Sequence, residues 1–398
     1  MVIIFNVIAA FGINAQSSNS STKDTGKLHK QEDATDIFLK TFKIKIKPDT
    51  AKLKPGKIYL ALFPAVGYTV ANSGTATIAA NASFYTNNID STNLSTILTE
   101  PLYSLYHQVI LPVISNIWLK NNDINFLGDW RFYKYPSYTY GLGGNTNIGD
   151  ADMLNYSYVK VYQEVLKRFA ENLYVGVGYN LDYHYDISEV SAPAVSNYDA
   201  YNGSAVSTTT SSGIVFHFKY DSRTNINNPR DAFFGSVIYR YNTPLLGSDD
   251  EWQSLEIEWR KYIKISPGSN NTLAFWSWNT FTFGGKVPYL DLPSTGWDTY
   301  ANSGRGYIQG RFRGTTLLYL ESEYRFGITR NGLLGGVVFV NGEAVPDWPS
   351  KYIQAVDPGY GIGLRIKLNR YSDTNLCIDY GFGTEASKGF FFNLGEVF

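Results

Sequence analysis

The stretch Gly304-Arg305-Gly306-Tyr307-Ile308-Gln309-Gly310-Arg311-Phe312-Arg313-Gly314, together with the segment 316–327 after it, decides the fold. Two sets of side chains alternate in that segment: Leu318, Leu320, Ser322, Tyr324 and Phe326 on one parity, and Tyr319, Glu321, Glu323 and Arg325 on the other. Successive side chains of a β-strand point to opposite faces, whereas a helix would mix the two sets. The pattern therefore predicts a strand with one apolar, aromatic face and one charged face that meets water.

The same alternation recurs in other parts of the chain. In 172–186 one face carries Leu173, Val175, Val177, Tyr179, Leu181, Tyr183 and Tyr185, and the other carries mostly Asn172, Gly176, Gly178, Asn180, Asp182, His184 and Asp186. In 251–265 the polar face is Glu256, Glu258, Arg260, Tyr262 and Lys264. Strands of a soluble sandwich also have one apolar face, but long ionic and phenolic side chains in series suit a water-filled lumen.

We expect sixteen strands from residue 57 onward. They lie near 57–70, 75–86, 93–104, 107–119, 123–135, 154–169, 172–186, 212–222, 231–243, 251–265, 271–284, 315–327, 331–341, 356–369, 374–384 and 389–398. An even number is typical of bacterial barrels, and an open sheet edge cannot lie in hydrocarbon. The sequence therefore predicts an all-β protein, with a transmembrane antiparallel β-barrel of about sixteen strands in 57–398.

The segments outside the expected strands are of three kinds. Long gaps such as 187–211 and 285–314 alternate with short turns such as those at 121–122 and 331–332, which predicts long extracellular loops and short periplasmic turns. Residues 1–15 read as a signal peptide with an apolar core. Residues 16–56 are rich in Ser, Lys and Asp and are expected to form a periplasmic tether.

Composition excludes several classes of protein. The formal net charge is −1, which gives no electrostatic reason to expect a nucleic-acid partner. Cys377 is the single cysteine, so neither an intramolecular disulfide nor a cysteine metal cluster is available, and the four histidines are scattered. Aromatic residues make up 16% of the chain, with 31 Tyr, as the aromatic girdles of a membrane barrel require.

Motifs for catalysis or cofactor binding are incomplete. Gly141-Leu142-Gly143-Gly144 lacks the Gly-Lys-Ser/Thr of a phosphate loop, and the glycines of 359–363 have no βαβ context. His184 with Asp182 and Asp186, and His217 near Asp221, have acid–base chemistry, but no nucleophile stands out beside them. We expect no enzyme, and no catalytic, cofactor or metal site.

The opening stretch resembles the sixth extracellular loop and the next strand of the BamA/TamA outer-membrane proteins, the bacterial surface antigen family. In that family the loop folds into the lumen, and its arginine pairs with carboxylates on the inner wall. The resemblance implies that Arg305, followed by Gly306 and Tyr307, is the loop arginine and that Glu323 is its partner. The second acidic partner of the family falls near Asn341, which predicts a weaker attachment of the loop here.

Two further stretches resemble the same family. The turn motif at 220–235, with Asp221, Arg223, Pro229 and Gly235, is similar to the family's turn between two barrel strands. The last ten residues resemble the β-signal, a final strand that ends on an aromatic residue. Its positions are Phe392, Asn393, Gly395 and Phe398. A terminal strand with an exposed edge is able to pair with an assembly machine by β-augmentation.

The resemblance implies a function in the assembly, insertion or translocation of proteins at the outer membrane of a Gram-negative bacterium. Outer-membrane lipids and unfolded outer-membrane proteins are the implied partners, and no oligomeric state is implied. About forty residues before the barrel are too few for a POTRA domain, so the chain is expected to be a short member that lacks these domains. Two alternatives remain open: a passive outer-membrane channel, and a structural or accessory subunit of an envelope complex that works through 16–56.

Overall fold

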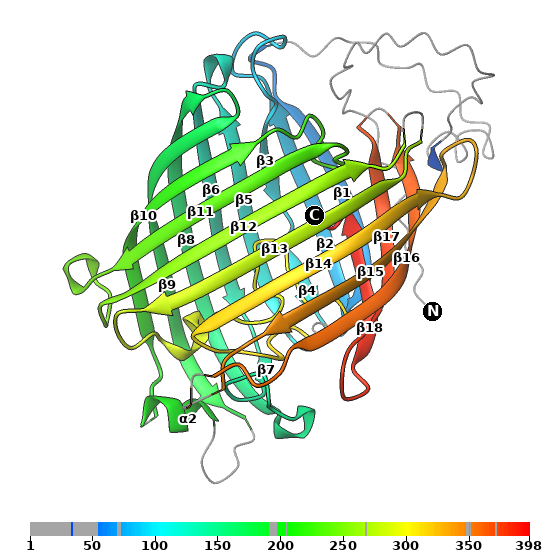
Figure 1. Cartoon of the computed structure of the whole chain (residues 1–398). Coiled ribbons are helices and arrows are strands. Elements are labelled where there is room, and N and C mark those ends of the chain that lie inside the picture. Colours follow the sequence, from blue (N-terminus) through cyan, green and yellow to red (C-terminus); the bar gives the residue numbers. More distant parts are fainter. Residues whose placement is uncertain are drawn as a thin grey trace.

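The computed structural model describes residues 33–34, 55–69, 73–190, 197–203, 205–266, 269–347, 350, 352–370 and 372–398. The predicted signal peptide lies outside the described residues, as does nearly all of the predicted tether. The described chain is all-β, and its strands form one antiparallel sheet that curls into a barrel (Figure 1). Among the described residues, no helix is long and apolar enough to cross a lipid bilayer.

The elements follow one another in this order. The strands are β1 (Tyr59–Thr69), β2 (Ser73–Phe84), β3 (Ser95–Thr99), β4 (Leu102–Ser104), β5 (Val109–Trp118), β6 (Ile124–Lys134), β7 (Ser137–Thr139), β8 (Asp152–Ala170), β9 (Leu173–Glu189), β10 (Thr209–Asp221), β11 (Ala232–Asn242), β12 (Trp252–Lys264), β13 (Thr272–Phe283), β14 (Thr316–Gly327), β15 (Leu334–Ala344), β16 (Asp357–Asn369), β17 (Thr374–Phe382) and β18 (Lys388–Leu394). The short helices are η1 (Lys120–Asn122), η2 (Ile148–Asp150), α2 (Asn197–Asn202), η3 (Pro244–Leu246) and η4 (Tyr289–Asp291).

These eighteen strands make a wall of sixteen, which confirms the predicted number. Strands β3 and β4 both pair with β2 and with β5, so they are one wall strand interrupted at Pro101. Strands β6 and β7 both pair with β8 and are interrupted at Pro136. Proline has no N–H to donate, so it breaks the ladder without ending the strand's path. The prediction ended this wall strand at residue 135 and missed β7.

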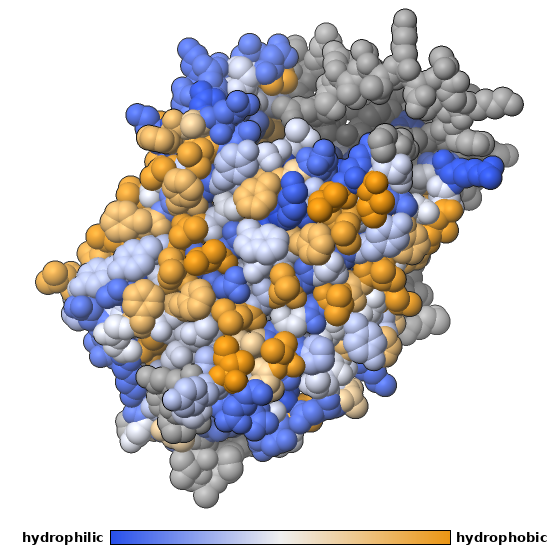
Figure 2. All heavy atoms as spheres, in the orientation of Figure 1, coloured by the Kyte–Doolittle hydropathy of each residue, from blue (hydrophilic) through white to orange (hydrophobic). Residues whose placement is uncertain are grey.

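Alternation along the strands separates the two faces of the wall. On β14, Glu321 and Glu323 are 0% exposed and point into the barrel, while Leu320 is 54% exposed on the outside. On β9, Asp182 and His184 point inward and Val177 points outward. Figure 2 shows apolar side chains spread over the middle of the outer wall and hydrophilic ones gathered mainly towards the two ends. The predicted faces of these strands are confirmed.

The first and last strands meet differently from all the others. Each neighbouring pair of wall strands from β1 to β18 is joined by an antiparallel ladder. Strands β1 and β18 lie against each other, but no ladder joins them among the described residues. We call this junction the seam. It is the one place in the described wall where strand edges face each other without registered hydrogen bonds.

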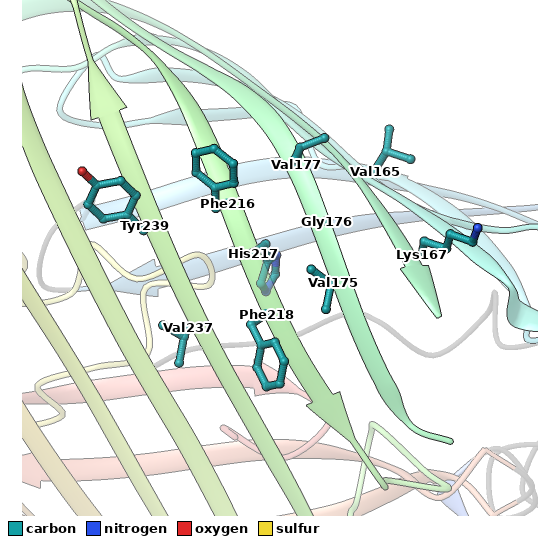
Figure 3. A pocket seen from close by; sticks show the side chains of 10 residues that line it. All are labelled: Val165, Lys167, Val175, Gly176, Val177, Phe216, His217, Phe218, Val237 and Tyr239. Carbon is teal, nitrogen blue, oxygen red and sulfur yellow. The ribbon is translucent and has the colours of Figure 1, made fainter. Parts of the chain in front are cut away.

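The outer wall also carries a shallow apolar hollow of about 520 Å³ across β8 to β11. Figure 3 shows its lining, which includes Val175, Val177, Phe216 and Phe218. These side chains belong to the outward parity of their strands, so the hollow faces away from the lumen.

Candidate functional site: the lumen loop and the seam

The segment 284–315 between β13 and β14 folds into the barrel and crosses it; we call it the lumen loop (Figure 1). Near its start, the Tyr289 hydroxyl contacts Thr139 Oγ1 at 2.6 Å, and Ser211 of β10 donates to Asp291 at 2.5 Å. Further along, Arg305 reaches Asp379 on β17, on the other side of the barrel. The loop is therefore attached to opposite walls and occupies the lumen, as the predicted inward-folded loop requires.

Arg305 is the centre of the attachment to β14 and β17. Its guanidinium is 1% exposed and contacts the carboxylates of Glu321, Glu323 and Asp379. The Phe339 ring lies 3.8 Å from the guanidinium carbon and covers one face of the group. Three carboxylates around one planar cation use the fork of donors that arginine, unlike lysine, provides.

The contact between Arg305 and Glu323 joins the two residues that the family resemblance singled out. Asn341 has a different place from the one expected, because its Nδ2 donates to the main-chain oxygen of Arg305 at 2.9 Å. Sequence reasoning missed Glu321 and Asp379, which supply the acidic contacts that Asn341 does not. The expectation of a weaker attachment rested on Asn341 alone, and these two carboxylates remove its basis.

Gly306 and Tyr307 fit the loop closely against β16 and β17. Gly306 has φ of +119°, and a Cβ there would lie 2.6 Å from the main-chain oxygen of Phe382, so only glycine fits. The Tyr307 hydroxyl donates to the main-chain oxygen of Pro358 at 2.6 Å and accepts from the N–H of Thr384 at 3.1 Å. These contacts fix the backbone directly after Arg305.

The arginine cluster extends beyond the loop to the last residues of the chain. Arg325 contacts Glu323 at 2.6 Å and Glu396 at 3.6 Å. Arg365 contacts Glu396 at 2.7 Å and also pairs with Asp379. Three arginines and four carboxylates thus form one connected cluster, which we call the lumen cluster: Arg305, Arg325, Arg365, Glu321, Glu323, Asp379 and Glu396. It ties the lumen loop, three wall strands and the segment after β18 together.

The part of the lumen loop around Tyr289 is buried among aromatic residues. Tyr198 and Tyr201 of α2 pack edge-on against Tyr289, and Arg313 donates to the main-chain oxygen of Tyr289 at 3.1 Å. Burial, together with the charge of Asp182, raises the pKa of the Asp291 carboxyl to about 8. Asp291 is therefore largely protonated at neutral pH.

The predicted last strand is wrong at its end. Strand β18 stops at Leu394, Gly395 has φ of +85°, and the chain turns from the wall into the lumen. Phe398 is 2% exposed and packs against Tyr262 and Trp276, so it does not lie on the outer face. Of the proposed β-signal positions, Phe392 and Asn393 remain on the strand. The physical reason is that glycine permits the left-handed turn and the lumen offers an aromatic site to bury Phe398. Whether these positions act as a β-signal stays a prediction.

The loop that contains the turn motif also contacts the segment after β18. Arg223 forms a two-pronged pair with Asp221 at 2.9 and 2.8 Å, and Gly235 is the fourth residue of β11. Pro229 lies in the loop between them. From the same loop, the main-chain oxygen of Asn227 accepts from the N–H of Glu396 at 2.6 Å. The turn thus reaches across the short-turn end of the barrel.

Glu164, His217 and Ser236 in the lumen are arranged like the acid, histidine and serine of a hydrolase triad. His217 contacts Glu164 through Nδ1 at 2.5 Å and Ser236 through Nε2 at 2.9 Å. The backbone of Ser236 lies in ladders with β10 and β12 on both sides, so its N–H is not available as an oxyanion donor. We assign it no activity. Within the described part of the chain, no group of three or more metal-ligating side chains could hold an ion.

Comparisons with known proteins support the same fold. No family model and no curated protein matches the sequence. Among solved structures, BamA from Haemophilus ducreyi lacking POTRA domains 1–3 matches with a TM-score of 0.56 at 13% identity, over 85% of this chain and 70% of that one. CdiB from Acinetobacter baumannii matches at 0.54 and 14% identity, over 85% and 60% of the two chains. CdiB from Escherichia coli matches at 0.56 and 7% identity, over 88% and 68%. The part of the chain that the structure describes is therefore a β-barrel of the BamA type in fold, and includes no POTRA domain.

Proposed function

We propose that this chain is an outer-membrane barrel that assists the insertion or translocation of proteins, and that its working site is the seam between β1 and β18. The observation that carries the proposal is a wall joined by ladders everywhere in the described residues except at this junction. The likeness of the fold to BamA and CdiB barrels supports it. The predicted partners are outer-membrane lipids and unfolded outer-membrane proteins.

The chemistry of the seam follows from its unpaired edges. Backbone N–H and C=O groups without partners are costly in hydrocarbon. A client strand that pairs with the free edge of β18 satisfies these groups by β-augmentation. Strand β18 has seven residues, and Phe390 and Leu394 face outward, where a client strand and lipid meet. A short strand with a ladder on one side is the part of the wall that separates most readily.

The alternative of a passive channel has less support. The lumen loop is attached to opposite walls, and Tyr289, Arg305 and Phe312 within it are at most 1% exposed. Phe398 fills part of the remaining space against Trp276. A pore that passes solutes freely needs a continuous water-filled path, and these buried side chains occupy the lumen where such a path would run. We expect no large steady conductance in planar bilayers.

A folding assay tests the proposal directly. The chain from Gln16 is reconstituted in liposomes, an unfolded barrel protein is added outside, and its folding rate is followed by the gel shift of the folded form. We expect faster folding than in empty liposomes and than in liposomes holding an unrelated barrel of similar size. Equal rates in all three would refute insertase activity. If a partner protein then co-purifies with the full chain and is lost on deletion of 16–56, the accessory role takes its place.

A further inference from the structure

We propose that Asn302 and Glu396 are positioning residues that hold strand β18, one edge of the seam, to the lumen loop. In this arrangement β18 moves away from the seam only when the loop and the lumen cluster rearrange. The inference rests on the proposed function insofar as the seam is the working site. The contacts that support it lie on the inner side of the barrel. They can therefore be tested without a client protein.

Asn302 of the lumen loop bridges the loop and β18 through one amide. Its Nδ2 donates to the main-chain oxygen of Val397 at 2.7 Å, and its Oδ1 accepts from Nδ2 of Asn393 on β18 at 2.8 Å. The backbone of Asn302 is itself held, because its N–H donates to the carboxylate of Asp298 at 3.0 and 3.1 Å. The amide is therefore already in position to receive β18 and the residues after it.

Glu396 makes the second connection. Its carboxylate accepts from Nε of Arg365 at 2.7 Å and from Nδ2 of Asn375 at 2.6 Å. Arg365 also pairs with Asp379, and Asp379 in turn contacts Arg305 of the loop. Removing Glu396 from the lumen would leave the charge of Arg365 with fewer partners in a buried site, which is unfavourable.

Two further contacts keep the segment after β18 inside the barrel. Arg325 donates to the main-chain oxygen of Phe398 at 2.9 Å, and the thiol of Cys377 donates to that of Gly395 at 3.0 Å. With a ladder on one side of β18, these lumen contacts stand in for the hydrogen bonds that are absent at the seam. Because the same arginines contact Glu323, which binds Arg305, displacement of the loop and of β18 are energetically coupled in both directions.

The test measures the distance between β1 and β18 without any client. Spin labels are placed at Leu60→Cys on β1 and Phe390→Cys on β18, which are 77% and 46% exposed on the outer wall. Cys377 is buried, so the folded barrel is not labelled there. Asn302→Ala and Glu396→Gln are the test variants. Glu258→Gln is the matched control in the lumen, since its contacts stay within β12 and β13. Asn279→Ala is a second control, which removes a contact with Ser277 on the outward face of β13.

We expect Glu396→Gln to increase the population with a longer β1–β18 distance by about fivefold, the effect of losing one buried hydrogen bond. Asn302→Ala should increase it more, because this variant loses two hydrogen bonds. The controls should leave the distances as in the parent protein. Unchanged distances in either folded test variant would overturn the inference, and so would equal widening in the controls. If one test variant fails to give the gel-shifted, folded barrel, the other decides. Widening in a barrel that does not accelerate client folding would sustain the coupling and refute only the proposed function.

Discussion

Substituting Arg305 by Ala removes a side chain that contacts three carboxylates of the lumen cluster, and so tests how much this cluster stabilises the barrel. The three carboxylates around Arg305 differ in the partners that they keep when Arg305 is removed. Glu323 keeps Arg325 at 2.6 Å, and Asp379 keeps Arg365. Among the described contacts, Glu321 keeps only the hydroxyl of Tyr319. The cost of the substitution therefore falls mainly on Glu321, which is 0% exposed and cannot recover water.

The magnitude follows from removing one partner of a buried ion pair. Such a loss costs about 3–5 kcal/mol because a charge stays buried without compensation. Adding Glu321→Gln to Arg305→Ala should recover about 1–3 kcal/mol, since a neutral amide needs less compensation than a carboxylate. Arg305→Lys should restore only part of the loss, because one ammonium cannot reach three carboxylates in the geometry of the guanidinium.

The assay is guanidinium unfolding of the barrel in detergent, followed by tryptophan fluorescence and by the gel shift of the folded form. Arg330→Ala is the matched control, because Arg330 is exposed in the turn before β15 and its removal should change stability by about 0.5 kcal/mol or less. A loss below about 1 kcal/mol in Arg305→Ala, set against the range above, would refute the reasoning. So would a double variant with Glu321→Gln that is no more stable than the single one.

Three other changes to the chain, one loop replacement and two substitutions, test separate parts of the site. Replacing 286–312 by a short flexible linker should convert a barrel of low conductance into one with a large steady conductance in planar bilayers; equal conductance would show that the loop does not fill the lumen. Phe398→Ala should cost about 3–5 kcal/mol in the same unfolding assay, and Phe390→Ala, on the lipid side, much less; equal losses would contradict the lumen position of Phe398. Because the folded pKa of Asp291 is raised to about 8, stability should fall as pH rises from about 4 to 8, and Asp291→Asn should flatten this slope. An unchanged slope in that variant would assign the pH dependence to other groups.

Strand positions were predictable because the signal for each strand is local. Alternation in 316–327 and 172–186 places each side chain on its face without knowledge of any neighbour, and β14 and β9 confirm it. The final strand failed for an equally local reason. Gly395 was read as one more strand residue, although glycine also permits the turn with φ of +85° that leads the chain inward.

The acidic partners of Arg305 show where local signals stop. Glu321 shares the parity of Glu323 and lies two residues before it, so the alternation already placed it on the inner face. Asp379 is 74 residues from Arg305 in sequence, and its position beside the loop depends on the registers of β14 to β17. The resemblance pointed to Asn341 instead, whose amide turned out to hold the backbone of Arg305.

By itself, the sequence determined that this protein is an antiparallel barrel of sixteen wall strands with an apolar outside and a polar lumen, because each of these depends on the period-two pattern. The inward course of the arginine loop was implied by the family resemblance. Only the tertiary structure decided which carboxylates surround Arg305, that the segment after β18 enters the lumen, and that β1 and β18 meet without a ladder. Those features depend on strand register and on the closure of the barrel, which bring together residues far apart in the chain. The distance between two residues along the sequence does not indicate whether they contact each other in the closed barrel.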